Sequence, residues 1–389
     1  MVKIKTLEEN KTGEWIDFSE RIFNLRKLGY NPGFIQESMN QRDRNDILVI
    51  EEEGKIVSCL LLTPYELYFN GVVFKGAEIG GVATDERFRG KGYMSHLMEE
   101  AVTKMHREGY DLSCLGGYRD RYATWGYESG GTGYSFCVNK RSTKTLIADK
   151  KVNLLQYAPS SSVLAKIIEA HQKLPIRMMR AKKRYELFFN FLKLDNTEAW
   201  TGETENDEFA YAVVQRPTEK VSINILEYGG SPQVFECMLK EFFVQWGPET
   251  ISVAAPGIRT PFAPLLNRIA CSWSISPCRQ WRVVNLKTCL EKIVAIQAAK
   301  INNLSFSTPF SLTLKIKETG ENSTIVFDKG CRVTDKQGKE EVVLTQCEMA
   351  LLFFGVGKPG NTFGLKKENA AYLDLIFPLP LYQWSLDRG

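Results

Sequence analysis

Histidine is scarce in this chain, which has 389 residues but only His96, His106 and His171. A metal site built mainly from histidines is therefore excluded, and we expect no metal. The nine cysteines are scattered and include no C-x-x-C pair. This pattern is not that of a disulfide framework or a structural zinc site, and it is typical of reduced, packed cysteines in a cytoplasmic protein.

Long apolar runs and an excess of one charge are also missing. No apolar stretch approaches the roughly 20 residues of a membrane span, and the start, Met1–Lys5, leads into charged residues rather than an apolar signal segment. The net charge is only +4, from 50 Lys and Arg against 46 Asp and Glu. This charge argues neither for nor against a charged partner. We expect no membrane partner because no apolar run could span one, and no nucleic-acid partner because the basic residues lack interleaved aromatics and an overall basic balance.

The composition is that of an ordinary globular protein, with 43% hydrophobic and 25% charged residues. At roughly 150 residues per domain, the length predicts two or three domains. The first, residues 1–150, begins with helical spacing at Trp15, Phe18 and Ile22, and continues with strands over 47–51, 56–62, 65–69, 72–74 and 77–84. A helix over 91–108 and a strand over 111–117 complete this α/β block.

The remaining sequence divides into two further predicted domains, 151–285 and 286–389. In the second, a long helix over 161–194 with a break at Pro175 precedes strands over 209–214 and 221–228, a helix over 233–246 and a strand over 251–254, an order that repeats the first block. The third has a helix over 286–293, strands over 310–316, 323–327 and 341–344, and a helix from about Thr345. The predicted fold class is α/β (α+β).

The segment Arg87-Phe-Arg-Gly-Lys-Gly92, an R-x-x-G-x-G pattern, lies between a predicted strand and a predicted helix. Unpaired N–H groups and the positive end of the dipole make a helix N-terminus suitable for a pyrophosphate. Gly90 and Gly92 allow close approach of the backbone, and Arg87, Arg89 and Lys91 add positive charge. Taken alone the pattern is weak, because a basic loop that only turns the chain looks the same.

The surrounding sequence adds two features. Gly80-Gly81 lies inside a predicted strand, where glycine often marks a bulge or the approach of a ligand. Tyr122-Ala-Thr-Trp-Gly-Tyr127 follows the next strand. The loop is neither a Walker loop nor the G-x-G-x-x-G of dinucleotide-binding proteins.

In this order, the strand Gly81–Thr84, the loop Arg87–Gly92 and the Y-x-x-x-G-Y segment resemble the GNAT superfamily of acyl-CoA-dependent N-acyltransferases, over roughly residues 45–140. The second block has no R-x-x-G-x-G, and Trp281–Lys287 is similar to the entry to a third domain. The whole chain therefore resembles the enhanced intracellular survival (Eis) family. The resemblance implies a catalytic GNAT domain with a central mixed sheet, a degenerate GNAT-like domain and a C-terminal sterol-carrier-like α+β domain.

The resemblance also implies roles for particular residues. Acetyl-CoA would be the co-substrate, its pantetheine pairing with Val82, Ala83 and Thr84, and an N–H group of the bulged strand would stabilise the oxyanion. Tyr122 matches the tyrosine that protonates the leaving thiolate, and the base would be the C-terminal carboxylate, here Gly389, or Glu78 on the strand beside the cofactor. The cofactor-binding loop comprises Arg87, Phe88, Arg89, Gly90, Lys91, Gly92 and Tyr93.

Structural alternatives to these roles stay open. Tyr122 could instead be a packed tyrosine covering the sheet, Tyr127 fits core packing better than catalysis, and Glu78 could be an outward-facing strand carboxylate. We interpret the basic window 177–184 as a solvated helix face. The aromatics Phe18, Phe23, Tyr30 and Phe34 are either a lip of the acceptor site or core.

The implied function is transfer of acetyl directly to a primary amine in a ternary complex. The alternatives are an acyltransferase with a longer acyl donor and a non-enzymatic CoA- or lipid-binding protein. The acceptor is expected to be a small-molecule or peptide amine, with aminoglycosides, polyamines and lysine side chains as candidates. A polycationic acceptor would require an acidic cleft. The resemblance further implies a cytoplasmic homo-oligomer, for which a hexamer is common in the family.

Overall fold

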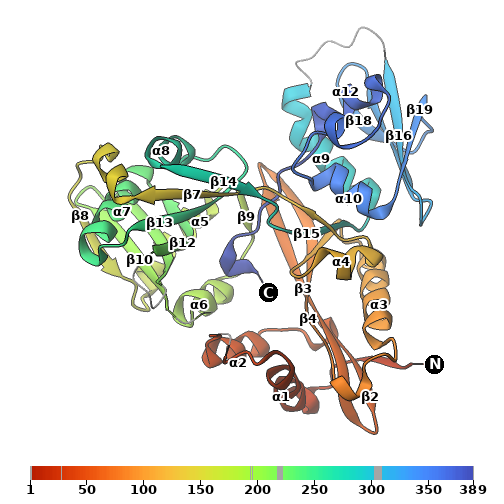
Figure 1. Cartoon of the computed structure of the whole chain (residues 1–389), viewed down its shortest axis with the longest axis horizontal. Helices are drawn as coiled ribbons and strands as arrows, with labels where there is room; N and C mark the ends of the chain where they lie inside the picture. Colours follow the sequence, from red (N-terminus) through yellow and green to blue (C-terminus); the bar gives the residue numbers. More distant parts are fainter. Residues whose placement is uncertain are drawn as a thin grey trace.

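The computed structural model describes residues 2–27, 29–192, 194, 196–216, 222–301 and 309–388. These residues form three sheets, of eight, seven and four strands, each covered by helices. The three units lie around a central junction, and the C-terminal end of the chain lies between the first and second of them (Figure 1).

The first sheet has the strand order β1-β2-β3-β4-β5-β15-β6, and β9 pairs with β3 outside this path. The Asn70-Gly71 turn joins β3 to β4, as the sequence predicts, with both residues at positive φ (45° and 94°). The two strands predicted over 56–69 are one continuous strand. The elements of this unit are β1 (Ile4–Thr6), α1 (Thr12–Phe23), α2 (Pro32–Asn40), β2 (Ile47–Glu52), β3 (Lys55–Phe69), β4 (Val72–Thr84), α3 (Tyr93–Arg107), β5 (Leu112–Leu115), α4 (Arg119–Tyr122), β6 (Glu128–Gly130), β9 (Ile176–Met178) and β15 (Arg279–Val283).

The second sheet has the order β14-β7-β13-β12-β11-β10-β8. The helix predicted over 161–194 is wrong in its middle, where Ile176 and Met178 are buried in β9, which pairs with the first sheet. The predicted start of β12 at Val221 lies outside the described residues. The elements are β7 (Gly133–Asn139), β8 (Val152–Gln156), α5 (Ser161–Gln172), α6 (Lys182–Asn190), β10 (Thr197–Thr204), β11 (Phe209–Gln215), β12 (Ser222–Gly230), α7 (Pro232–Trp246), β13 (Thr250–Pro256), α8 (Ala263–Ile269) and β14 (Ser272–Ser276).

The third sheet has the order β18-β17-β16-β19. The predicted helix from Leu286 is twice as long as expected, and the short strand β18 is not among the predicted strands. The helix predicted near Thr345 begins there, because Thr345 and Glu348 form a capping box. The elements are α9 (Leu286–Ile301), β16 (Phe310–Ile316), β17 (Asn322–Phe327), β18 (Cys331–Thr334), β19 (Glu340–Leu344), α10 (Gln346–Phe354), α11 (Pro359–Thr362) and α12 (Lys367–Ile376).

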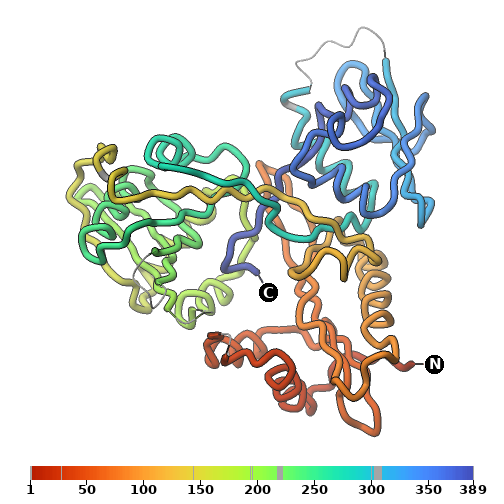
Figure 2. Tube along the Cα trace, viewed as in Figure 1, coloured from red at the N-terminus to blue at the C-terminus, as the bar shows by residue number. Residues whose placement is uncertain are grey.

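Strand pairing joins the units across the predicted domain boundaries. β7 precedes residue 150 but pairs with β13 and β14 in the second sheet. β15 precedes residue 285 but pairs with β5 and β6 in the first. The chain therefore passes from the first sheet to the second, returns to the first at β9 and again at β15, and only then enters the third (Figure 2).

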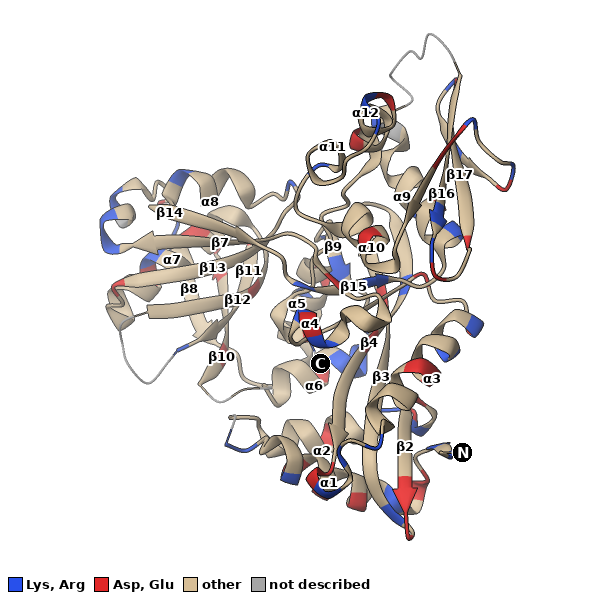
Figure 3. Cartoon of the chain, turned by 45° about the vertical axis from the view of Figure 1, so that its right-hand side comes forward, with Lys and Arg blue, Asp and Glu red and all other residues tan. Residues whose placement is uncertain are grey.

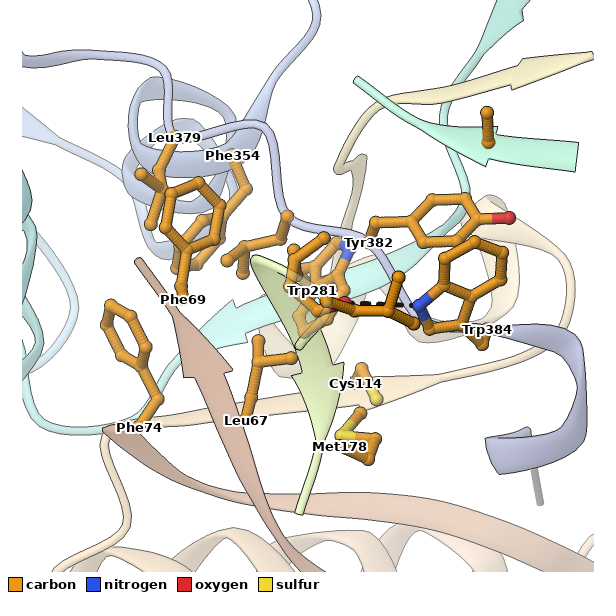
Figure 4. Close-up of a cluster of buried hydrophobic side chains, with 14 of the residues drawn as sticks. Leu67, Phe69, Phe74, Cys114, Met178, Trp281, Phe354, Leu379, Tyr382 and Trp384 are labelled. Atoms are coloured by element: carbon orange, nitrogen blue, oxygen red, sulfur yellow. Dashed lines mark hydrogen bonds between the residues drawn. The ribbon is translucent and has the colours of Figure 1, made fainter. Parts of the chain in front are cut away.

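A buried aromatic cluster holds this junction together. Trp281 of β15 and Trp384 of the C-terminal segment are 0% and 1% exposed, and the Trp384 indole donates to the carbonyl of Ile176 at 3.1 Å. Tyr382 and Phe354 pack beside them (Figure 4). Burial of each large apolar side chain contributes about 1.5–3 kcal/mol. The last residues of the chain are thus fixed between the sheets.

Within the described residues, no helix combines the length and the apolar character that crossing a membrane would need. All nine cysteines are free thiols; four of them are buried and Cys271 is exposed.

Candidate functional site

Strands β4 and β5 separate at the centre of the first sheet. They pair in parallel only from Gly76 opposite Leu112 to Ile79 opposite Leu115. From Gly80 to Thr84, β4 remains paired with β3 but no longer with β5. The edge of Gly80–Thr84 that faces away from β3 therefore has no strand paired with it in the described structure. Such an edge can hydrogen-bond an extended amide-containing ligand.

A β-bulge lies at the point where the two strands separate. Leu61 pairs with Gly80 and Cys59 with Ala83, so Gly81 and Val82 together oppose one residue of β3. Gly81 has φ +55°, a conformation that side chains disfavour. The sequence prediction that Gly80-Gly81 marks a bulge is confirmed. Bulges re-aim backbone groups, which is what an oxyanion site requires.

The R-x-x-G-x-G loop follows β4 directly and leads into α3, which begins at Tyr93. Gly90 and Gly92 have φ of +82° and +77°, so both glycines are required by the backbone itself. Gly92 caps α3 without a side-chain hydrogen bond to its first turn. The N-terminus of α3 therefore offers backbone N–H groups to an anion.

Asp85, whose side chain is 3% exposed, binds two of the arginines beside this loop. Arg87 binds it through Nε at 3.1 Å and Nη2 at 3.0 Å, and Arg21 of α1 binds it at 2.9 Å. These guanidiniums, Arg87 foremost, lower the pKa of Asp85. Arg87 thus holds the loop through Asp85, while its own side chain stays 77% exposed.

Of the other predicted loop residues, Arg89 and Lys91 are exposed and Tyr93 is buried. Arg89 pairs with Glu86 at 3.4 Å, and the Lys91 amine lies 4.8 Å from the centre of the Phe88 ring. Tyr93 is buried, and its hydroxyl donates to Glu52. The loop therefore presents Arg89 and Lys91 to solvent next to the orphan N–H groups of α3.

Tyr122 ends the short helix α4 and is 7% exposed. It packs in the same apolar cluster as Leu115 and Tyr93, close to where β4 and β5 separate. Burial raises the pKa of its hydroxyl above the ordinary tyrosine value. Tyr127, in contrast, is 0% exposed and shares a hydrogen bond of 2.8 Å with Ser113, so its predicted packing role is confirmed.

Glu78 is buried in β4, 2% exposed, so it is not the outward-facing carboxylate that the sequence left as an alternative. It forms an ion pair with Arg279 of β15, and the Gln383 amide donates to it at 2.9 Å. Glu78 lines a polar cavity of about 280 Å³ between β4, β9 and α6. Arg279 and Gln383 had no local signal in the sequence.

A second cavity, of about 310 Å³, lies between α1, α2 and the bulge of β4. It is lined mainly by apolar side chains, together with Gly81 of the bulge. Of the four aromatics that the sequence proposed for this site, Phe23, Tyr30 and Phe34 line the cavity, whereas Phe18 is core, 3% exposed. This cavity is the candidate acceptor site, because Gly81 of the bulge forms part of its lining.

Three arginines also line the acceptor cavity: Arg42, Arg184 and Arg388. Arg184 belongs to the basic window 177–184, whose interpretation as a solvated helix face is wrong. Arg177 stacks on Tyr68, with its guanidinium 3.8 Å from the ring centre, and Arg180 is 1% exposed. The window spans β9 and the start of α6 at the junction of the sheets.

Arg180 anchors the end of the chain. Its guanidinium binds Glu227 of β12 at 2.6 and 2.9 Å and Asp387 at 2.6 and 2.7 Å. His171, Glu227 and Asp387 have ligand-type atoms within 4.8 Å of one another. The two carboxylates already bind Arg180, and His171 Nδ1 shares a hydrogen bond with the Tyr185 hydroxyl at 2.8 Å. This group fits an ion-pair network better than a metal site.

Gly389 lies outside the described residues. Its neighbour Arg388 lines the acceptor cavity beside Gly81.

Comparisons with known proteins agree with this geometry. Residues 3–130 match the family model described as acetyltransferase (GNAT) domain. This part of the chain is a GNAT acetyltransferase domain. A search of curated proteins gave no match.

Solved structures match the chain over its whole length. A protein of Enterococcus faecalis V583, described as a probable N-acyltransferase, has a TM-score of 0.75 at 17% identity and covers 98% of this chain and 97% of its own. A GCN5-related N-acetyltransferase of Anabaena variabilis has a TM-score of 0.73 at 15% identity over 100% of both chains. Eis1 of Mycobacterium abscessus has a TM-score of 0.68 at 12% identity over 100% of both. At these low identities, the similarity shows only that this chain and the three solved structures share a fold over their whole length.

Proposed function

We propose that this protein is an acetyl-CoA-dependent N-acetyltransferase that acts on a primary amine in a ternary complex. The observation that carries the proposal is the separation of β4 from β5 at the Gly81 bulge, followed at once by the Arg87–Gly92 loop. A CoA thioester needs both features, an unpaired strand edge for the amides of pantetheine and a cationic helix N-terminus for the pyrophosphate.

In this proposal, Val82, Ala83 and Thr84 pair with pantetheine, and the loop from Arg87 to Tyr93 holds the pyrophosphate. A backbone N–H of the bulge stabilises the oxyanion that develops on the thioester carbonyl. The amine nitrogen forms a bond to this carbon, and the carbon–sulfur bond breaks. Tyr122 gives its proton to the leaving thiolate, and its place in the apolar cluster beside Leu115, where β5 parts from β4, supports that role.

The proton that leaves the ammonium requires a base. We propose the carboxylate of Gly389 for this role, because Arg388 lines the acceptor cavity beside the bulge. Glu78 is the alternative, but its carboxylate is bound by Arg279 and Gln383 and borders the neighbouring polar cavity. An acid and a base of this kind each contribute about 10²–10⁴-fold to a rate.

The third unit is proposed to be sterol-carrier-like, and the protein to assemble as a homo-oligomer in the cytoplasm. Aminoglycosides, polyamines and lysine side chains are the acceptor classes to compare. A longer acyl donor and a non-enzymatic CoA- or lipid-binding role are the alternatives to acetyl transfer.

The test is release of free thiol from acetyl-CoA in the presence of a panel of amines. Release that depends on an amine would support the acetyltransferase. If acetyl-CoA binds tightly but no amine causes release, the longer acyl donor becomes the better proposal. If no CoA ester binds, the proposed function is wrong.

A further inference from the structure

The acceptor cavity is lined by apolar side chains together with positively charged ones. Trp15, Phe23 and Phe34 provide aromatic surface on one side. Arg42, after α2, and Arg184, on α6, lie on the wall shared with the polar cavity, because both residues line both cavities. Figure 3 shows α2 and α6 next to each other, with the C-terminal end of the chain nearby.

The direct contacts of the two shared arginines are with a hydroxyl and an aromatic ring. Arg42 Nη1 donates to the hydroxyl of Thr63 at 2.7 Å, and the Arg184 guanidinium lies 4.4 Å from the centre of the Phe188 ring. Among the residues that the structure describes, neither arginine forms an ion pair. Burial and the nearby Arg184 guanidinium lower the pKa of Arg42 to about 10, so both side chains remain cationic at neutral pH.

Negative charge on the acceptor cavity is sparse by comparison. Of the residues that the structure describes, one carboxylate lines it, Glu20, which accepts a hydrogen bond from the backbone of Arg26 at 3.3 Å. Within the same described part of the chain, the polar cavity is lined by four carboxylates, and each has a partner of its own. Glu78 binds Arg279, Asp387 binds Arg180 and Asp46 binds Lys104, while Asp43 accepts from the backbone of Asn45. A polycationic acceptor requires an acidic cleft, and this cavity has the opposite charge.

We propose that the acceptor is a primary amine that also carries a carboxylate and an apolar or aromatic body, as apolar amino acids do. Arg42 and Arg184 bind the carboxylate, the aromatic wall takes the apolar body, and the amine faces the bulge at Gly81. This inference rests on the proposed acetyltransferase function and narrows its acceptor. Both guanidiniums are half-buried, and a charge-assisted hydrogen bond to a carboxylate is stronger there than one between neutral groups.

The same charges assist the reaction. Two guanidiniums near an ammonium disfavour its charged form, so they lower the pKa of the acceptor amine. More of the amine is then present as the free base that attacks the thioester.

The experiment compares matched amines that differ only in the carboxylate. L-Phenylalanine is set against 2-phenylethylamine and L-leucine against 3-methylbutylamine, with spermidine and kanamycin as polycations. For each, kcat/KM is measured by thiol release from acetyl-CoA, and binding to the CoA-saturated protein is measured by calorimetry. We expect each amino acid to exceed its decarboxylated partner by about tenfold or more in both measurements, which is the range of one charge-assisted hydrogen bond.

Variants assign that preference to the two arginines. Arg184→Gln and Arg42→Gln are expected to remove most of it, mainly through KM, and Arg184→Lys to restore part. The control is Lys182→Gln on the same helix, whose side chain is 73% exposed and whose substitution should leave the preference intact. Thermal unfolding shows whether each variant is folded. If a glutamine variant does not fold, Arg184→Lys still tests the role of the guanidinium.

The outcomes separate this inference from the proposed function. Turnover of spermidine, kanamycin or the decarboxylated amines without a preference for the amino acids would overturn the inference and leave the acetyltransferase standing. Absence of thiol release with every amine would contradict the acetyltransferase, while carboxylate-dependent binding lost in Arg184→Gln would still support the anion site. Absence of both binding and turnover of the amino acids would overturn the inference.

Discussion

Glu78 and Gln383 are 305 positions apart in the sequence, and the Gln383 amide donates to the Glu78 carboxylate at 2.9 Å. The same amide donates to the carbonyl of Asp387 at 2.9 Å. Arg279 binds Glu78 from the other side. One buried carboxylate therefore joins β4, β15 and the turn that leads the chain to the acceptor cavity.

A first prediction concerns the two roles open to Glu78. Glu78→Gln leaves Arg279 buried without its counter-charge, which costs about 3–5 kcal/mol, so we expect a lower melting temperature. The double variant Glu78→Met with Arg279→Leu removes both charges and should recover most of that loss. The measurement is thermal unfolding of the two variants together with thiol-release activity.

Activity of the double variant separates anchor from base. If Glu78 only anchors the chain, the folded double variant retains substantial kcat. Loss of activity in a double variant of wild-type stability would instead make Glu78 the base.

A second prediction compares the two tyrosines of the Y-x-x-x-G-Y segment. Tyr122→Phe should lower kcat by about 10²-fold or more, as loss of a general acid does, and leave the Kd for acetyl-CoA unchanged. Tyr127→Phe removes a buried hydrogen bond to Ser113 and should cost about 1 kcal/mol of stability with little change in kcat. Steady-state kinetics and calorimetry of both variants decide, and equal effects on kcat would remove Tyr122 as the acid.

A third prediction uses two glycines with equal strain. Gly90 in the loop and Gly109 after α3 have φ of +82° and +72°, and a Cβ at either would meet nothing within 4 Å. Alanine at each should cost about 1–2 kcal/mol of stability. Only Gly90→Ala should also weaken acetyl-CoA binding, by tenfold or more, because only that loop is proposed to hold the pyrophosphate. Calorimetric titration tests this, and equal affinities in the two variants would contradict the loop's role.

The features that could be predicted from the sequence are those that depend only on residues within one short segment. The Gly81 bulge, the loop, α3 and the Asn70-Gly71 turn follow from local backbone demands of glycine and from helical spacing. Arg279, Gln383 and Arg180 act through partners 47 to 305 positions away, and their chemistry appears only when strands from different sheets meet. The basic window shows the limit most clearly, because a buried arginine and a solvated arginine look alike in one sequence.

A fourth prediction concerns pH and Asp85, whose folded-state pKa is lowered by Arg87 and then by Arg21. A lowered pKa adds stability that is fully present above the ordinary value of about 3.9 and is lost as pH falls through the folded value. The melting temperature of the wild type should therefore exceed that of Asp85→Asn by a constant amount from pH 5 to 8, and the gap should narrow below pH 4. A gap that stays constant down to pH 3 would show that the two arginines do not stabilise the ionised carboxylate.

The last prediction tests the proposed base by moving a single carboxylate. One glycine added after Gly389 shifts the terminal carboxylate by about 3.3–3.6 Å, whereas Gly389→Ala changes the side chain and keeps the carboxylate on the same residue. If that carboxylate takes the ammonium proton, the extended chain loses kcat by about 10²-fold and Gly389→Ala remains active. Both proteins keep Arg180, Asp387 and Gln383, so the anchoring of the segment is unchanged and melting temperatures should agree. Full activity of the extended chain would exclude this carboxylate as the base. The double variant Glu78→Met with Arg279→Leu would then decide between two cases. In one, Glu78 is the base; in the other, the acceptor amine is already neutral beside Arg42 and Arg184 and needs no protein base.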